Sequence, residues 1–372
     1  MLKKLIRLTT VSLSQNLLLK GQLKYLSNYY EVVAVASGAE ELRLVGEREG
    51  VRCQPIEMCR EISIFSDIRS LFKLYFLFKK EKPYIVHANT PKGSLLGMIA
   101  AKFAGVPNRI YTVTGLRFET EKGLKRAVLK FTERLTCKFA TKVIPEGDGV
   151  KDIMIKENIC SDISPKIHNG NINGVDLNYY DANNNAIKEK ALSLRKYDFT
   201  FCFVGRITKH KGINELVRAF VRLNKDNPHT GLILVGPIEE KLDSEIQNII
   251  ELHPHIRFEG YQVDIRPYLS ASDIFVFPSY REGFPNVVLQ AGAMSLPSIV
   301  TDISGSREII QNNVNGVIIP PKDEDALYDA MKRMMNSKDE LKAMGERARE
   351  VIEKNFDQKD VWEGIKSVYD SL

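Results

Sequence analysis

The sequence predicts an α/β protein with two domains, each a doubly wound parallel sheet. Short apolar, β-branched runs alternate with amphipathic stretches, which is typical of sheets covered by helices on both faces. A chain of 372 residues has room for two or three domains of about 150 residues each. The alternation stops at 169–190, where turn-forming and polar residues dominate, and then restarts. We therefore expect domains at 1–175 and 176–354, with a final helix at 355–372 that packs back on the first domain.

The first half should contain strands separated by helices. Apolar runs of strand length predict strands at 4–8, 31–36, 84–87, 109–113 and 141–144. Apolar residues at helical spacing predict helices at 17–27, 66–80, 94–104 and 124–139.

The second half repeats this pattern. We expect strands at 200–204, 231–235, 256–258, 274–278 and 298–301, and helices at 213–224, 240–252 and 286–294. Ligands of such sheets bind at the carboxyl ends of the strands. The loops that follow residues 204 and 278 are therefore the first places to search for a site.

The net charge of +6 is unevenly distributed along the chain. Residues 1–170 contain 28 Lys and Arg against 17 Asp and Glu, whereas residues 171–372 contain 25 against 30. This asymmetry indicates that the first half meets an anionic surface or substrate. The sequence has no zinc finger, RNP motif or basic arm, so we do not expect nucleic acid as the partner.

Cysteine usage and hydropathy favour a cytoplasmic location. The five cysteines form no C-x-x-C pair, which predicts neither a zinc site nor a disulfide framework. Arg7 interrupts the apolar stretch that a signal peptide would need. The longest charge-free stretch, 283–301, contains two prolines and is better explained by a helix and a strand than by a membrane span. The D-x-D at Asp323 and Asp325 predicts the acidic first turn of a helix, and we expect no metal site.

The most specific stretch follows the predicted strand 274–278. Glu282 lies in a loop, and Pro285 stands where a helix should begin. The start of a helix presents backbone N–H groups and a partial positive charge, which suit phosphate. Glu282 could accept hydrogen bonds from sugar hydroxyls beside that phosphate, or it could simply cap the helix.

A second cluster follows the predicted strand 200–204. Gly205 allows close approach of the backbone. Arg206 and Lys211 are cations at the carboxyl end of a strand, where a pair can clamp a diphosphate. Neither a G-x-G-x-x-G fingerprint nor a P-loop occurs, so the two clusters together predict a phosphate-bearing ligand of another kind.

These motifs resemble those of glycosyltransferase family 4. The G-R-x-x-x-x-K-G at 205–212, the E-G-F-P at 282–285 and the N-G-V-I-I-P at 315–320 come in the family's order. The stretches 87–93 and 112–116 resemble enzymes of bacterial capsule and lipopolysaccharide assembly. The resemblance implies the GT-B fold, which has two facing Rossmann-like domains and an interdomain cleft. The first domain would bind the acceptor and the second the nucleotide sugar.

The resemblance also implies roles for single residues. Glu282, Arg206 and Lys211 would be catalytic, with the two cations on the donor's diphosphate and the carboxylate on the transferred sugar. The donor would also contact Gly205, Gly283, Phe284, Asn286, Val287 and Gln290. Gln290 stands where the family usually has a second Glu, so an acceptor oxygen is kept but its charge is lost.

On the acceptor or sugar side we expect His87, Lys92, Thr114 and Gly115. Many relatives have a His where this chain has Thr114. His87 is the substitute that the sequence offers, although a strand residue of this kind could equally be a core histidine.

The function implied by the resemblance is retaining transfer of a hexose or N-acetylhexosamine. The donor would be a UDP-linked sugar, the acceptor a lipid-linked glycan of bacterial surface polysaccharide synthesis, and no metal or other cofactor would be needed. A nucleotide-sugar epimerase of the same fold and a noncatalytic sugar-nucleotide-binding protein are the alternatives.

A peripheral position on the cytoplasmic face of the inner membrane fits the basic first half. The stretches 68–80 and 122–139 are amphipathic and basic, so they could lie on an anionic membrane surface. Their apolar residues could instead pack on the first sheet. In 122–139 these apolar residues are Leu124, Val128, Phe131, Leu135 and Phe139.

Overall fold

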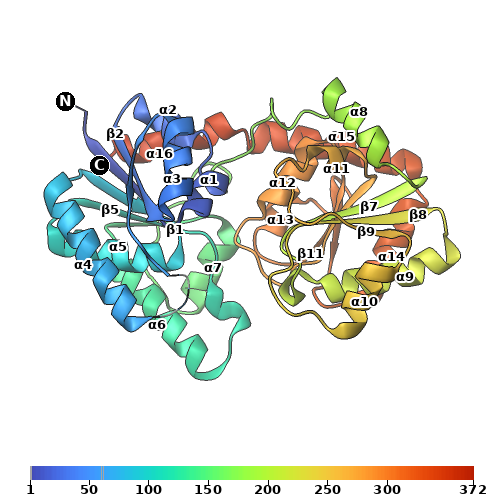
Figure 1. The fold of residues 1–372 in the computed structure, drawn as a ribbon, viewed down its shortest axis with the longest axis horizontal. Helices are drawn as coiled ribbons and strands as arrows, with labels where there is room; N and C mark the ends of the chain where they lie inside the picture. Colours follow the sequence, from blue (N-terminus) through green and yellow to red (C-terminus); the bar gives the residue numbers. More distant parts are fainter. Residues whose placement is uncertain (1, 60, 62) are drawn as a thin grey trace. The chain divides into compact units, whose positions relative to one another are not determined.

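The computed structural model describes residues 2–59, 61 and 63–372. The chain divides into a first unit, Met1–Asn173 with Gln358–Leu372, and a second unit, Gly174–Asp357. Each unit has a six-stranded sheet with helices on its faces (Figure 1). The paired strands within the described residues run parallel. The predicted fold class of two doubly wound α/β domains is therefore confirmed.

The first sheet has the strand order β3-β2-β1-β4-β5-β6. Its strands are β1 (Lys4–Val11), β2 (Glu31–Ser37), β3 (Arg52–Pro55), β4 (Ile85–Ala88), β5 (Asn108–Val113) and β6 (Lys142–Pro145). Successive side chains of a strand point to opposite faces. Ile6 and Leu8 of β1 accordingly join one core cluster, and Leu5 joins another.

Helices cover both faces of the first sheet. They are α1 (Ser12–Leu18), α2 (Gln22–Ser27), α3 (Ala39–Glu49), α4 (Ile64–Glu81), α5 (Pro91–Ala104), the 3-10 helix η1 (Arg117–Thr120), α6 (Gly123–Phe139), α7 (Asp148–Lys156) and α16 (Gln358–Asp370). Leu74 and Phe78 of α4 pack with Ile6, and α5 contacts both α4 and α6. Val361 of α16 packs with Leu5 on the opposite face. The C-terminal helix is thus part of the first unit.

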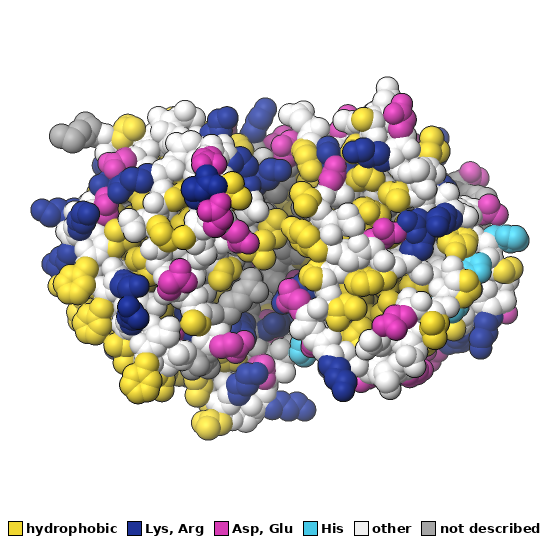
Figure 2. Space-filling view, in the orientation of Figure 1, with side chains coloured by type: hydrophobic (Ala, Val, Ile, Leu, Met, Phe, Trp, Pro, Cys, Tyr) yellow, Lys and Arg dark blue, Asp and Glu magenta, His cyan; other side chains and the backbone are white. Residues whose placement is uncertain are grey.

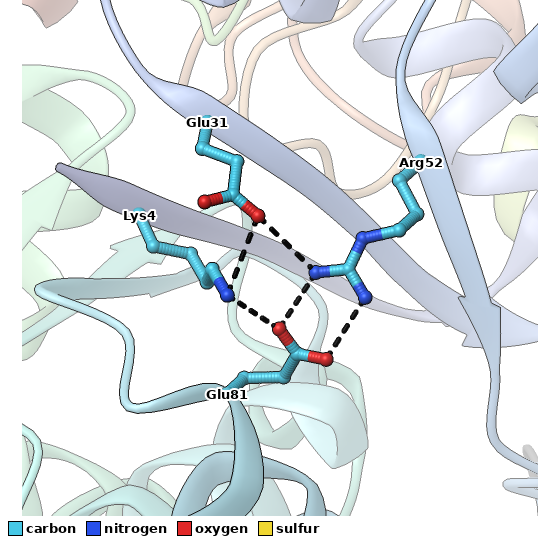
Figure 3. Close-up of polar contacts among 4 residues, drawn as sticks. All are labelled: Lys4, Glu31, Arg52 and Glu81. Atoms are coloured by element: carbon cyan, nitrogen blue, oxygen red, sulfur yellow. Dashed lines mark hydrogen bonds and ion pairs between the residues drawn. The ribbon is translucent and has the colours of Figure 1, made fainter. Parts of the chain in front are cut away.

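Four charged residues fasten α4 to the amino ends of the first strands (Figure 3). Glu81, at the end of α4, lies 2.6 Å from both Lys4 Nζ and Arg52 Nη2. Glu31 lies 3.3 Å from Lys4 and 3.4 Å from Arg52. The hydrogen bond with Arg52, opposed by burial and reinforced by Lys4, lowers the pKa of Glu81 to about 2. The Glu81 carboxylate therefore stays ionised at neutral pH.

The second sheet has the strand order β12-β11-β10-β7-β8-β9. Its strands are β7 (Phe199–Val204), β8 (Thr230–Val235), β9 (Ile256–Phe258), β10 (Ile274–Phe277), β11 (Ser298–Thr301) and β12 (Gly316–Ile319). Its helices are α8 (Asn185–Leu194), the 3-10 helix η2 (Lys209–Lys211), α9 (Ile213–Asp226), α10 (Ser244–Leu252), α11 (Arg266–Ser270), α12 (Asn286–Ala293), α13 (Ser306–Ile309), α14 (Glu324–Met335) and α15 (Lys338–Asn355). Strands β7 and β10 pair with each other, so their loops leave the sheet side by side.

Two of the predicted helices have clearly different bounds from those expected. The single helix expected at 17–27 is two helices, since Gly21 between them adopts a positive φ of 82°. The helix expected at 240–252 begins only at Ser244. Within the described residues, no helix is both long enough and apolar enough to cross a bilayer.

Candidate functional site

A half-buried ion pair lies at the carboxyl edge of the second sheet. Lys211, which follows β7, pairs through Nζ with the carboxylate of Glu282, which follows β10. Ser279 Oγ donates to the same carboxylate oxygen at 2.7 Å. Lys211 Nζ also lies 4.9 Å from the centre of the Phe277 ring. The two clusters that the sequence singled out therefore meet in one place.

Close packing of the two loops fixes this pair. A Cβ on Gly212 would lie 2.1 Å from the carbonyl oxygen of Pro278, and its φ is +72°. Only glycine fits a backbone approach this close. The Tyr280 N–H donates to the carbonyl of His210 at 2.9 Å, which ties the loops together from the other side. Lys211 and Glu282 are held by backbone geometry as well as by their own attraction.

Glu282 does not cap the helix that follows it. The N-cap of α12 is Pro285, whose side chain makes no capping hydrogen bond. The carboxylate instead accepts from Lys211 and Ser279. The amides of the first turn of a helix have no acceptor within the helix and present a partial positive charge. The first residue of α12, Asn286, thus comes four residues after the carboxylate that is paired with Lys211.

The remaining residues expected at the donor differ in what they can offer. Phe284 is buried and its ring lies 5.5 Å from that of Phe356, so only its backbone can meet a ligand. Gly283 is buried, and Asn286 and Val287 are half-buried. Gln290 is half-buried, one turn into α12, and its carboxamide makes no hydrogen bond to the described part of the chain.

Arg206 does not join the ion pair in this conformation. Its side chain is 57% exposed, and Nη1 lies 3.2 Å from Glu239, in the loop that follows β8. Gly205 beside it packs so closely that a Cβ on Gly236 would lie 1.8 Å from the Gly205 carbonyl oxygen. The structure therefore brings Lys211 and Glu282 together but pairs Arg206 with Glu239.

In the first unit, His87 is a core residue, which corrects its placement on the sugar side. Its side chain is buried, with Nδ1 2.5 Å from the Tyr369 hydroxyl and Nε2 2.7 Å from Thr112 Oγ1. Both ring nitrogens are thus occupied within the fold. Burial, helped by the nearby Arg7 cation, holds the pKa of His87 well below its usual value. The imidazole is neutral at neutral pH and has no nitrogen left for a substrate.

The other residues expected on the acceptor side lie at the carboxyl edge of the first sheet. Lys92 Nζ, on the first turn of α5, lies 2.8 Å from Asp67 Oδ1 of α4. Thr114 Oγ1 donates to the carbonyl of Asn89 at 2.7 Å. Gly115 has a φ of +123°, which other residues rarely adopt. These residues shape the loops after β4 and β5.

Sequence reasoning missed two residues at these edges. Ser279 has no motif of its own to mark it, yet its hydroxyl donates to the Glu282 carboxylate and so positions it. Asn89 is buried, and neither polar atom of its side chain has a hydrogen-bond partner within the described residues. Its place directly after a buried strand, in the stretch 87–93, was the signal that could have marked it.

In the part of the chain that is described, no group of three or more His, Cys, Asp or Glu side chains is arranged to hold a metal ion. Asp323 is the N-cap of α14 and accepts from the Ala326 N–H at 2.9 Å, as expected for the start of a helix.

Comparison with known proteins assigns the chain to a family. Residues 184–351 match the family model described as glycosyl transferases group 1, and residues 8–146 match the glycosyl transferase 4-like model. The chain is 32% identical over 374 residues to the Staphylococcus aureus capsular polysaccharide biosynthesis glycosyltransferase CapM, covering 100% of this chain and 97% of that one. It is 34% identical over 319 residues to the Escherichia coli UDP-Gal:alpha-D-GlcNAc-diphosphoundecaprenol alpha-1,3-galactosyltransferase, covering 84% and 81%.

Among solved structures, Anabaena HepE in complex with UDP-glucose superposes with a TM-score of 0.84 at 19% identity, covering 99% of this chain and 100% of that one. A sucrose-phosphate synthase from Thermosynechococcus elongatus has a TM-score of 0.80 at 18% identity, covering 99% of each chain. These likenesses show the fold, and the identity to CapM over the whole chain shows the relationship. The chain is a glycosyltransferase that belongs to the family 4-like enzymes with the GT-B fold.

Proposed function

We propose that the protein transfers a sugar from a UDP-linked donor to a lipid-linked glycan in bacterial surface polysaccharide synthesis, with retention of configuration. The observation on which this rests is the Lys211–Glu282 pair beside the start of α12. It offers a cation, a carboxylate and helix amides within one stretch of the second unit. A diphosphate with a sugar attached needs these three kinds of group.

In this proposal Lys211 and the first turn of α12 bind the diphosphate, and Glu282 accepts hydrogen bonds from hydroxyls of the transferred sugar. Ser279 positions Glu282 by donating to its carboxylate. Arg206 would leave Glu239 and join the diphosphate, a small cost because that pair is exposed. Gln290 would accept from a ribose hydroxyl. Backbone atoms of Gly205, Gly283, Phe284, Asn286 and Val287 would line the same ligand.

The chemistry follows from where charge develops. As the bond between the anomeric carbon and the phosphate oxygen breaks, negative charge grows on the departing diphosphate. Fixed positive groups already in place stabilise that charge without reorganising. A phosphate oxygen of the leaving group takes the proton of the acceptor hydroxyl, which attacks from the same face. This retaining route needs no protein base, consistent with the burial of His87, and no metal ion.

The acceptor and the location are proposed from the relatives and from charge. The Escherichia coli relative is named for a diphosphoundecaprenol acceptor, and CapM for capsular polysaccharide. The basic charge of this chain lies in residues 1–170, which would bind a phosphate-bearing, lipid-linked acceptor. Lys92, Thr114 and Gly115, at the carboxyl edge of the first sheet, would contact that acceptor. The enzyme would work at the cytoplasmic face of the inner membrane.

A direct test is a transfer assay with purified protein, a panel of UDP-sugars and an acceptor made of a sugar linked through diphosphate to a polyprenyl chain. We expect one UDP-sugar to give a new lipid-linked product, with the anomeric configuration of the donor kept. Transfer with inverted configuration would contradict the retaining mechanism. No product with any UDP-sugar, although UDP binds, would contradict the enzymatic proposal.

One observation favours a second candidate. Gln290 lacks the charge of the family's second Glu, which would suit a protein that binds sugar nucleotides without catalysis. Binding of a UDP-sugar in calorimetry with no turnover on any lipid-linked acceptor would support it. An epimerase of the same fold would isomerise the nucleotide sugar with no acceptor present, and the same assay without acceptor detects that.

A further inference from the structure

Helices α4 and α6 of the first unit turn apolar side chains away from the core. On α4 the exposed residues are Ile64, Phe65, Ile68, Phe72 and Phe76, and Phe65 is 91% exposed. Positions 65, 68, 72 and 76 recur at helical spacing, so they form one stripe. Ser70, Leu74 and Phe78 occupy the opposite, buried side of the same helix.

In helix α6, polar side chains are buried and several apolar side chains are exposed. Its buried residues are Glu133, Thr136 and Cys137. Leu124, Val128 and Phe131 are exposed instead, Phe131 by 62%. The alternative that this apolar stripe packs on the first sheet is therefore wrong for these three residues. A helix that buries a carboxyl group and exposes a phenylalanine ring is suited to contact an apolar environment outside the fold.

The two stripes belong to one surface. Helix α5 lies between α4 and α6 and contacts both. Its Phe103 is exposed, and Leu95 and Ile99 on the same side are half-buried. Figure 2 shows yellow side chains gathered along the edge of the molecule that Figure 1 assigns to α4. We call this surface, formed by the outward sides of α4, α5 and α6, the apolar face.

Basic residues flank the apolar face on α4. Arg69, Lys73, Lys79 and Lys80 are exposed, and none has a carboxylate partner among the residues that the structure describes. Both acidic residues of α4 are used elsewhere: Asp67 pairs with Lys92 at 2.8 Å, and Glu81 is part of the network in Figure 3. On α6, Arg126 and Lys130 share the single carboxylate of Glu157. The four cations of α4 that have no carboxylate partner within the described residues thus lie on the same helix as its exposed phenylalanines.

We propose that the apolar face inserts into an anionic lipid bilayer, with the phenylalanines of α4 among the acyl chains and its lysines and arginine at the headgroups. Amphipathic helices with this combination lie in the plane of the interface, buried to a depth of about 5 to 10 Å. Each basic residue near the surface adds attraction for anionic lipids. A protein partner would need carboxylates placed opposite individual cations of α4. An anionic bilayer attracts the whole basic surface without such matched pairs.

The apolar face lies close to a residue that we propose at the acceptor. Lys92, which we propose at the acceptor, is paired with Asp67, two residues from Phe65. The first turns of α4 and α6 lie at the carboxyl edge of the parallel sheet, as do the loops with Thr114 and Gly115. Insertion would hold this edge at the headgroups, where the diphosphate of a lipid-linked acceptor lies. This deepens the proposed function and rests on it for its meaning, but vesicle binding is measured without any substrate.

The test is sedimentation of the full chain with vesicles, comparing phosphatidylcholine alone with a mixture that contains about one third phosphatidylglycerol. We expect binding to the anionic vesicles. The triple variant Phe65→Ser, Phe72→Ser, Phe76→Ser should weaken it by about tenfold or more. The matched control, Leu192→Ser, Leu252→Ser, Val263→Ser, removes exposed apolar residues of the second unit and should bind as the unchanged protein does.

A charge series separates the two contributions. Arg69→Glu, Lys73→Glu, Lys80→Glu should abolish the preference for anionic vesicles, whereas Lys196→Glu, Lys225→Glu, Lys342→Glu should weaken binding much less. UDP binding by calorimetry and the free energy of unfolding in urea should both be unchanged in all four variants, which shows that both units are folded. Failure to bind UDP in the unchanged protein would count against the proposed donor site and leave the bilayer proposal standing.

Two outcomes would overturn the proposal. One is vesicle binding that the phenylalanine variant leaves intact. The other is a dimer in solution that this variant dissociates, with no vesicle binding by the unchanged protein, because the face would then be covered by a second copy of the chain.

Discussion

The two sheets have the same strand order, but the side chains at their carboxyl edges lie in different environments. In the second unit, Lys211 and Glu282 form a half-buried pair, with the start of α12 close behind in the sequence. In the first unit, His87 at the end of β4 is sealed in the core by Tyr369 and Thr112. β4 and β10 hold the same place in their sheets, yet the loop after β10 carries the carboxylate of a charged pair, whereas β4 itself carries a histidine whose ring nitrogens are engaged within the fold.

Removing the carboxylate of the second unit should have the largest effect. Glu282→Ala should lower the rate of transfer by about 100-fold or more, because hydrogen bonds to a charged group near the reacting centre are lost. The measurement is kcat at saturating donor. Glu245→Ala, which removes an exposed carboxylate paired with Arg218 in the same unit, is the control. A rate close to that of the unchanged protein would remove Glu282 from the site.

The cation of the pair should affect donor binding. Lys211→Ala should weaken UDP binding by about 1.5 to 3 kcal/mol, the contribution of a charged hydrogen bond. Calorimetry measures this directly. Lys209→Ala, in the same loop but paired with Asp243 at 2.7 Å, should leave the affinity nearly unchanged. Equal losses in the two variants would indicate general attraction rather than a clamp.

The buried histidine of the first unit should affect stability instead. His87→Ala should lower the free energy of unfolding by about 1 to 3 kcal/mol, because two buried hydroxyls lose their partner. UDP binding to the second unit should be unchanged. Urea denaturation and calorimetry make the comparison. A variant with full stability and no transfer would instead indicate that His87 contacts the substrate.

The pKa of His87 also gives this contribution a pH dependence. Its pKa in the folded protein is well below 6.5, so below about pH 6.5 the unfolded chain binds a proton that the folded chain does not. Stability is therefore lost as the pH falls below that value. The slope should be shallower in His87→Ala than in the unchanged protein, with denaturation at pH 7.5 and pH 5.5 as the measurement.

The smallest effect is expected at Gln290. Gln290→Glu restores a charge-assisted hydrogen bond and should tighten UDP binding by about twofold to tenfold. Clearly weaker binding would mean that this site uses the amide N–H groups of Gln290, and the proposed contact with the ribose would be wrong.

Much of the fold could be predicted because apolar runs report buried parallel strands. Strand β3, which was not predicted, shows why this fails: Arg52–Pro55 is an edge strand with exposed and half-exposed residues and no apolar run. The same holds for α3, in which only Leu42 and Val45 among its apolar residues are buried. Polar strands and helices at the edge of a fold show little periodicity of apolar residues, so the sequence pattern does not predict them.

The candidate site was predictable only in part, for a related reason. Motifs placed Lys211 and Glu282 in loops after neighbouring strands, and the structure joins them. The partner of His87 is 282 residues away in the sequence, which no spacing can indicate. In α6 the period identified the residues that share a face, but it could not say that the face points outward.

We propose that the donor's diphosphate and sugar bind at the Lys211–Glu282 pair. A crystal structure of the protein with a UDP-linked sugar is the decisive measurement. We expect phosphate oxygens at Lys211 Nζ and the first amides of α12, with sugar hydroxyls on the Glu282 carboxylate. A nucleotide bound elsewhere, with the Lys211–Glu282 pair unchanged and out of reach of the ligand, would contradict it.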